Sequence, residues 1–174
     1  MKKENDKNIL LAAGGTGGHL YGAESLASEL SLRGFNPFLF TDKRVGHLVK
    51  GLIQGNVKEI FSATFTNTSF YKWPFVVFKI LLGFMSSLIL IKKIKPKAVV
   101  GFGGYPTIPV IFAAKVCGLK IIIHEQNIIL GRANKLLIKL ADIISLGFEN
   151  TVGVPKNYRK KVYFSGNPVR KDIL

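Results

Sequence analysis

Residues 9–19 read ILLAAGGTGGH, and this stretch decides the fold of the 174-residue chain. Its five leading apolar residues are typical of a buried parallel strand. Behind the glycines, apolar residues between Ala23 and Leu30 recur at the spacing of one helical face. The order strand, glycine turn, helix predicts a phosphate or diphosphate site. Glycine lets the backbone come close to a ligand, and a helix N-terminus offers free N–H groups.

Two common nucleotide-binding motifs do not fit this glycine turn. The dinucleotide fingerprint needs a glycine at position 20, where the chain has Leu20. A P-loop needs Gly-Lys-Ser or Gly-Lys-Thr at its end, and neither follows here. A tight turn without a ligand is the alternative, but four glycines ended by His19 favour a ligand site.

Composition indicates one globular domain with a strongly basic surface. Apolar residues make up 48% of the chain and charged residues 20%, and the net charge is +15. Such a charge favours attraction to an anionic membrane surface or to a phosphorylated substrate. We expect no nucleic-acid partner, because only five of the 25 basic residues are arginines and no aromatic-basic repeat occurs. The single cysteine, Cys117, fits a reducing cytoplasm.

Apolar runs that alternate with helical patterns predict an α/β fold with a doubly wound, Rossmann-like parallel sheet. After the first strand, further strands are predicted at 36–40, 57–63, 98–101, 121–123, 143–145 and 162–164, and helices at 73–93, 107–117 and 131–141. Ligands of such sheets bind at the carboxyl ends of the strands.

Four polar clusters follow predicted strands and should therefore meet at one edge of the sheet. They are the glycine turn, GFGGYP at 101–106, HEQN at 124–127 and SGNPVR at 165–170. Each alone has a structural explanation, such as an ordinary turn for Gly-Gly-Tyr-Pro or a core histidine for His124. Their common position predicts a cleft. Asp42, behind the second strand, is expected to have a capping or turn role.

We expect no metal ion and no cofactor in this cleft. The sequence has no Asp-x-Asp pair and no cluster of histidine and cysteine. The negative charge of a diphosphate would then be met by helix N-termini, backbone N–H groups and arginine.

Residues 73–91 form a long apolar stretch that contains one charge, Lys79, and lysines follow it at 92, 93, 95 and 97. A membrane-spanning helix here would disrupt the sheet, since predicted strands flank it. Two alternatives remain: a helix buried against the sheet, or a helix partly sunk into an anionic membrane surface. For the second alternative, the expected membrane contacts are Trp73, Phe75, Phe78 and Leu82.

The motifs GGTGGH at 14–19, GGY at 103–105, HEQN at 124–127 and GNPVR at 166–170 resemble those of the MurG family in order and spacing. Members of that family are bacterial UDP-N-acetylglucosamine:undecaprenyl-diphosphate-MurNAc-pentapeptide N-acetylglucosaminyltransferases, inverting hexosyltransferases of the GT-B fold. The resemblance implies that residues 1–174 are the single, acceptor-binding N-terminal domain. The C-terminal donor-binding domain is then expected to be absent from this chain, and the chain alone is expected to be inactive.

The resemblance also implies partners and a location. The partners would be UDP-GlcNAc, undecaprenyl-diphosphate-MurNAc-pentapeptide (lipid I), an anionic membrane surface and a possible separate donor-domain chain. The product would be lipid II, a peptidoglycan precursor, made by a peripheral protein at the cytoplasmic face of the inner membrane.

Residue by residue, the resemblance implies three sets of contacts. Contacts with UDP-GlcNAc fall to Thr16, Gly17, Gly18, Asn127 and Arg170. Contacts with the acceptor diphosphate fall to Gly14, Gly15, Gly104 and Tyr105. His19 is the candidate general base for the MurNAc 4-hydroxyl, with Glu125 as its rival, and the alternative for His19 is a hydrogen bond that only orients the substrate.

Two other classes of function stay open. One is a non-catalytic, membrane-bound module that binds a polyprenyl diphosphate or a partner chain. The other is the nucleotide-binding domain of an oxidoreductase, against which the incomplete dinucleotide fingerprint argues.

Overall fold

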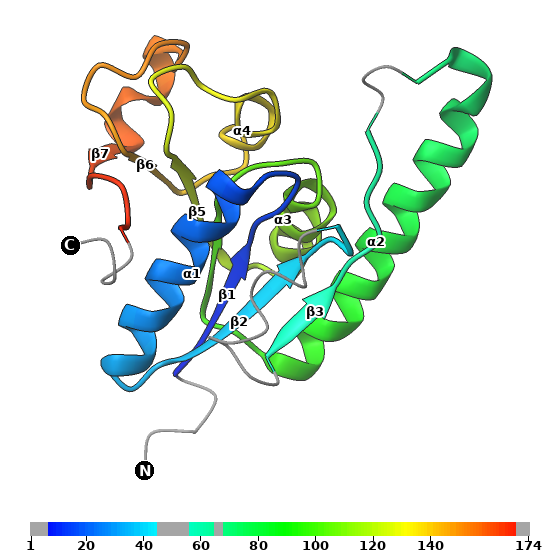
Figure 1. Ribbon diagram of the computed structural model, residues 1–174, viewed down its shortest axis with the longest axis horizontal. Coiled ribbons are helices and arrows are strands. Elements are labelled where there is room, and N and C mark those ends of the chain that lie inside the picture. The colour runs from blue at the N-terminus through cyan, green and yellow to red at the C-terminus, as the bar shows by residue number, and fades with distance from the viewer. Residues whose placement is uncertain (1–6, 45–55, 65–67, 170–174) are drawn as a thin grey trace.

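Seven strands form one parallel sheet in the computed structural model, which describes residues 7–44, 56–64 and 68–169 (Figure 1). The strands are β1 (Asn8–Ala12), β2 (Asn36–Thr41), β3 (Val57–Glu59), β4 (Ala98–Gly101), β5 (Lys120–Glu125), β6 (Ile143–Leu146) and β7 (Val162–Phe164). The α-helices are α1 (Gly17–Leu32), α2 (Trp73–Ile94), α3 (Thr107–Val116) and α4 (Arg132–Leu137), and two 3-10 turns, η3 (Phe70–Lys72) and η4 (Lys156–Lys161), accompany them.

The order of the strands creates a crevice beside β1. The sheet runs β3-β2-β1-β4-β5-β6-β7, and every neighbouring pair is parallel. The chain therefore builds outward from β1 in one direction and then, from β4, in the other. Ala12 at the end of β1 pairs with Gly101 at the end of β4, so the loops behind these strands start side by side. Such a switch point is where ligands of open α/β sheets bind.

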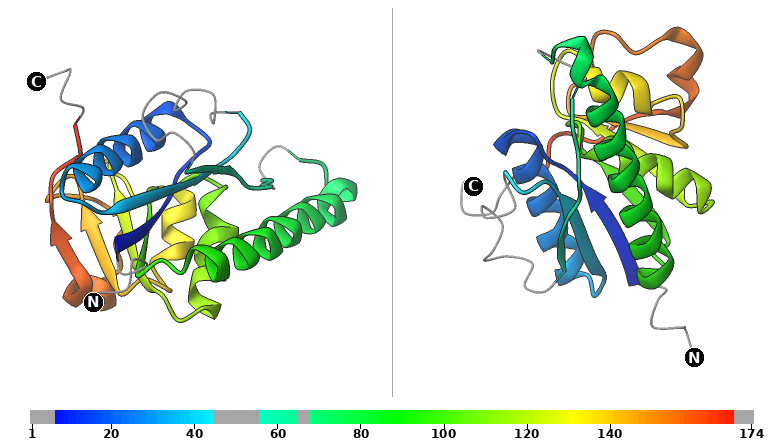
Figure 2. Two further views of the ribbon diagram at one scale, coloured as in Figure 1. Left: turned by 90° about the horizontal axis from the view of Figure 1, so that it is seen from below. Right: turned by 90° about the vertical axis from the view of Figure 1, so that its right-hand side faces the viewer.

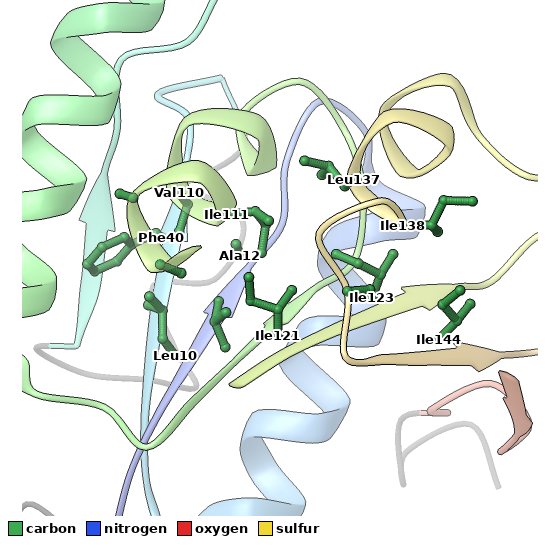
Figure 3. Close-up of a cluster of buried hydrophobic side chains, with 14 of the residues drawn as sticks. Leu10, Ala12, Phe40, Val110, Ile111, Ile121, Ile123, Leu137, Ile138 and Ile144 are labelled. Atoms are coloured by element: carbon green, nitrogen blue, oxygen red, sulfur yellow. The ribbon is translucent and has the colours of Figure 1, made fainter. Parts of the chain in front are cut away.

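Helices cover both faces of the sheet, which confirms the doubly wound prediction (Figure 2). On one face, Leu20 and Ala23 of α1 are buried with Leu11 of β1. The other face carries α2, α3 and α4, and Figure 3 shows its cluster, in which Ile111 of α3 and Leu137 of α4 lie over the sheet.

Several element boundaries differ from the predicted ones, and three of the differences bear on the site or the sheet. Helix α1 begins at Gly17, so His19 lies in its first turn. Strand β3 ends at Glu59, because it pairs only with β2 and only over three residues. Helix α4 ends at Leu137, four residues before the predicted end, and the chain continues in tighter turns. The Leu140 N–H donates to the Leu137 carbonyl at 2.9 Å, which starts the return into β6.

Helix α2 projects beyond the sheet at its N-terminal end (Figures 1 and 2). Its buried residues are Val76, Gly83, Ser87 and Ile91. Gly83 is a point of close approach, because a Cβ atom there would lie 2.0 Å from the Phe61 carbonyl oxygen. Phe70–Ile94 is the one described helix long and apolar enough to cross a membrane, and 22% of its apolar window is buried. The C-terminal half of the helix thus packs against the core, as in the first alternative, whereas its N-terminal end is exposed, as in the second.

Candidate functional site

Two glycine loops meet at the carboxyl ends of β1 and β4. Gly104 has φ +82°, and a Cβ atom there would lie 2.0 Å from the Gly14 carbonyl oxygen, so this position admits only glycine. The Thr107 hydroxyl ties the loops together, since it donates to the carbonyl of Gly103 at 2.7 Å and to that of Ala12 at 3.3 Å. The loops are therefore fixed against each other before any ligand binds.

His19 stands above these loops on the first turn of α1. Its Nδ1 lies 2.7 Å from the hydroxyl of Thr16, the residue that precedes the helix. Burial lowers the pKa of His19 below the 6.5 of an exposed histidine, while the Glu125 carboxylate and the Gly14 carbonyl oppose this shift. The imidazole is therefore neutral at pH 7 and able to accept a proton.

A cavity of about 330 Å³ opens beside His19. Its walls come from α1, the β4–α3 loop and the start of α4, and the residues that line it are His19, Gly103, Gly104, Tyr105, Gly131, Arg132, Ala133 and Asn134. The cavity therefore lies between His19, which follows the first glycine loop, and the second glycine loop at Gly103 and Gly104. A side chain at Gly103 would enter this space, because its Cβ atom would lie 3.2 Å from both the His19 ring and the Asn134 amide.

The Glu125 carboxylate is fully buried and accepts four hydrogen bonds. Asn127 donates its backbone and side-chain N–H groups to Oε1, both at 2.9 Å. Gly131 N–H and Asn134 Nδ2 donate to Oε2 at 2.8 and 2.9 Å. Glu125 therefore fixes both the Asn127 loop and the start of α4, which gives it a positioning role in the site.

His124 occupies the opposite face of β5 and is 3% exposed. Its Nδ1 lies 3.0 Å from the Ser145 hydroxyl, which in turn lies 2.6 Å from the Ser165 hydroxyl. The ring packs against Phe102 with centroids 5.3 Å apart. His124 thus has the surroundings of a core histidine, which is the structural explanation that the sequence analysis gave for it.

The structure brings most of the predicted residues to one edge of the sheet. Asn167 joins the HEQN segment, because its Nδ2 donates to the Gln126 carbonyl at 3.1 Å. The Asp42 carboxylate accepts hydrogen bonds from the Arg44 guanidinium within the turn behind β2, as expected of a turn residue. Arg170 lies outside the described residues. Within the described ranges, no group of three or more His, Cys, Asp or Glu side chains could hold a metal ion.

Sequence reasoning missed Arg132 and Asn134, which line the cavity from α4. Their position in the predicted helix that follows the HEQN segment could have indicated that they lie near the site. Polar residues at a helix start are common, however, and only the Glu125 hydrogen bonds reveal that this helix start turns toward the cavity.

Burial also lowers the pKa of His124, against the opposing effects of the Asn167 side chain and the Glu125 carboxylate. Between the lowered pKa and 6.5 the unfolded chain binds more protons than the folded one, so stability falls as the pH falls through this window. We expect the urea midpoint to drop between pH 7.5 and pH 5, and to drop less in His124→Gln. Equal drops of the urea midpoint in wild type and His124→Gln would contradict the lowered pKa of His124.

Sequence comparison places the chain in a known family. Residues 9–145 match the model of the glycosyltransferase family 28 N-terminal domain. The chain therefore belongs to glycosyltransferase family 28, as an N-terminal domain with the α/β sheet of GT-B enzymes.

The relatives are more specific, and they confirm the resemblance drawn from the four motifs. The chain is 43% identical over 173 residues to the UDP-N-acetylglucosamine--N-acetylmuramyl-(pentapeptide) pyrophosphoryl-undecaprenol N-acetylglucosamine transferase of Brucella abortus, covering 98% of this chain and 44% of that protein. It is 40% identical to the enzyme of that name from Methylorubrum populi, covering 95% and 45%. The crystal structure of Acinetobacter baumannii MurG superposes with a TM-score of 0.77 at 26% identity, covering 95% of this chain and 47% of that one.

The chain spans about half the length of the curated relatives it matches.

Proposed function

We propose that this chain supplies the acceptor half of an inverting N-acetylglucosaminyltransferase, which moves GlcNAc from UDP-GlcNAc to the MurNAc of lipid I and yields lipid II. The observation that carries the proposal is the cavity that joins His19 to two fixed glycine loops. The names of the 40–43% identical relatives support the choice of substrates.

In this proposal, His19 is the general base. If Nδ1 carries its proton and donates to Thr16, then Nε2 holds the lone pair that accepts the proton of the MurNAc 4-hydroxyl. The hydroxyl oxygen bonds to the anomeric carbon of GlcNAc as the bond to UDP breaks, which inverts that carbon. Glu125 stabilises the imidazolium that forms, in keeping with its effect on the His19 pKa. The Glu125 carboxylate already accepts four hydrogen bonds from neighbouring N–H groups, which makes it a poorer candidate for the base than His19.

The remaining proposed contacts divide between the acceptor diphosphate and the donor. Gly14, Gly15, Gly104 and Tyr105 face the acceptor diphosphate in the proposal, and their location at the loop junction and cavity supports this assignment. Thr16, Gly17, Gly18, Asn127 and Arg170 are proposed to contact the donor, which a second domain would hold from the other side.

Transfer of radiolabelled GlcNAc to a short-chain lipid I analogue tests the proposal. The donor half is supplied as a separate chain or by fusion, and product formation that depends on both halves is the expected result. Binding of the analogue without any transfer would instead favour the non-catalytic module. Binding of a nicotinamide cofactor would favour the oxidoreductase domain.

We further propose that α2 attaches the protein to the cytoplasmic face of the inner membrane. The exposed apolar side chains of its N-terminal end include Trp73, Phe75, Phe78 and Leu82, the four predicted contacts, which are 39–60% exposed. Lysines accompany them, and Lys79 lies 4.6 Å from the Phe75 ring centroid. An apolar helix face flanked by lysines fits the interface of an anionic bilayer.

Removing two aromatic side chains should weaken this membrane association. We expect Phe75→Ser plus Phe78→Ser to reduce flotation with anionic liposomes, because about 1.5–3 kcal/mol is gained for each large apolar side chain fully buried. High salt should also reduce flotation. The matched control is Leu32→Ser plus Phe35→Ser, which removes two exposed apolar side chains, one at the last residue of α1 and one just after it. Flotation that is unchanged in the α2 variant, or equally reduced in the control, would contradict the proposal.

A further inference from the structure

A second cavity, of about 390 Å³, lies between the carboxyl ends of β2 and β3 and the N-terminal half of α2. Its lining residues include Asp42, Lys43, Arg44, Glu59, Phe61 and Lys79. The segment behind β3 runs along α2 here (Figure 1), and the close approach of Phe61 to Gly83 fixes this wall of the cavity. The cavity is separate from the one beside His19, because the two share no lining residue.

The charged side chains in this cavity carry both signs. Asp42 accepts hydrogen bonds from the Arg44 guanidinium, so these two charges neutralise each other. In the part of the chain that the structure describes, no other ion pair involves a lining residue. The Glu59 carboxylate and the ammonium groups of Lys43 and Lys79 are therefore available to a ligand. A ligand with one anionic and one cationic group matches them, whereas a simple anion would also meet the Glu59 charge.

Lys79 connects this cavity to the exposed apolar face of α2. Its ammonium lies 4.6 Å from the Phe75 ring centroid, and Phe75, Lys79 and Leu82 share one face of the helix. Phe75 and Leu82 are exposed, and so is Phe61 at the cavity itself. A charged group bound in the cavity would therefore lie beside an apolar surface. Charged and apolar groups meet in this way at the headgroup level of a bilayer.

Phosphatidylethanolamine has the chemistry that this arrangement requires. Its headgroup joins a phosphate anion to a primary ammonium, and its acyl chains are apolar. Lys79 and Lys43 can donate to the phosphate oxygens, and the headgroup ammonium can donate to the Glu59 carboxylate. A glycerol headgroup has no cation for Glu59, and a choline headgroup has a quaternary ammonium without N–H donors.

We propose that this cavity binds a phosphoethanolamine headgroup, with Lys79 at its phosphate and Glu59 at its ammonium, and that the headgroup belongs to a phospholipid of the membrane. The proposal rests on the membrane attachment proposed for α2 and adds headgroup selectivity to it. General attraction between lysines and an anionic surface does not distinguish one headgroup from another, whereas a cavity with both signs of charge does.

Calorimetric titration of the chain with soluble, short-chain phospholipids tests the site without a bilayer. Short-chain phosphatidylethanolamine should bind, and short-chain phosphatidylglycerol should bind more weakly. Glu59→Gln should raise the Kd of phosphatidylethanolamine about tenfold, the effect of about 1.4 kcal/mol. The same substitution should lower the Kd of phosphatidylglycerol, because it removes a negative charge that faces the lipid phosphate. Lys79→Gln should raise the Kd of both lipids, since both carry a phosphate.

The matched control is Lys58→Gln, which removes an exposed lysine of β3 beside Glu59 that does not line the cavity. It should bind phosphatidylethanolamine as wild type does. Free O-phosphoethanolamine distinguishes the two sources of the headgroup, and it should bind more weakly than the lipid because it lacks acyl chains for the apolar face. Equal affinity for the two would identify a site for a soluble phosphate ester and overturn the membrane source.

The proposal is also overturned if wild type fails to bind short-chain phosphatidylethanolamine, if Glu59→Gln shifts the Kd of both lipids in the same direction, or if Lys58→Gln weakens binding as much as Lys79→Gln does. Its failure is distinct from that of the proposed attachment through α2. Flotation that depends on Phe75 and Phe78, without binding of the soluble lipid, would retain the attachment and reject this site.

Discussion

Replacing His19 by alanine is expected to lower kcat of GlcNAc transfer by about 10²–10⁴-fold when a working donor half is present. The loss is expected in kcat because the base acts only as the acceptor hydroxyl gives up its proton. His19 holds a suitable position, on the first turn of α1 and in the wall of the cavity, and its lowered pKa leaves it neutral before the reaction.

A change confined to the KM of the donor would show that His19 binds substrate instead of moving a proton. Thr16→Val is the companion variant, since it removes the hydroxyl 2.7 Å from Nδ1 and keeps the imidazole. It should lower kcat less than His19→Ala does. The analogue should bind His19→Ala with nearly unchanged affinity, which separates loss of catalysis from loss of the fold.

The pH profile gives an independent check on the same residue. Because burial lowers the His19 pKa, the acid limb of kcat should lie below pH 6.5, and activity should fall as the pH drops through that pKa. His19→Ala should lose this limb. An acid limb that persists unchanged in the variant would assign the base to another group.

The sheet and the meeting of the glycine loops could be predicted from sequence, because parallel strands buried on both faces leave continuous apolar runs. Those runs predicted the central strands, and the short edge strands β3 and β7 were also predicted although they are largely exposed. Parallel pairing then places every strand's carboxyl end at one edge, so the polar clusters had to meet there. The contact between Gly14 and Gly104 is the local result.

The direction of side chains at the site could not be predicted in the same way. Glu125 and His124 are neighbours on β5, and the alternation of a strand sends them to opposite faces. Which face meets the cavity depends on where α4 begins, and that start is fixed by hydrogen bonds from Gly131 and Asn134 to Glu125. Such long-range bonds leave no periodic signal in the sequence.

The course of α2 was ambiguous for a related reason. A helix that is apolar on most sides satisfies the pattern of a core helix and that of a membrane-facing helix equally well. Its exposure depends on how far it extends past the sheet. Helix α3 and the core cover only its C-terminal part, where Ser87 and Ile91 are buried, and leave Phe75 and Phe78 exposed.

The 174-residue chain by itself is expected to bind the acceptor without turning over. Holding the acceptor hydroxyl against the anomeric carbon is worth up to about 7–11 kcal/mol, and this requires both substrates to be held at once. The departing UDP also needs preorganised positive groups around it. The described residues form one sheet with the cavity beside His19 at its edge, and the chain matches 44–45% of the length of the relatives.

Addition of a donor half, in trans or by fusion, should therefore restore GlcNAc transfer to a short-chain lipid I analogue. The measurement compares the purified chain, the purified donor half and their mixture over many substrate equivalents. His19→Ala in the mixture is the control for a reaction that uses this chain's own site. Steady multiple turnover by the purified 174-residue chain would contradict the prediction, because a single acceptor cavity would then suffice to hold both the sugar donor and the hydroxyl that attacks it.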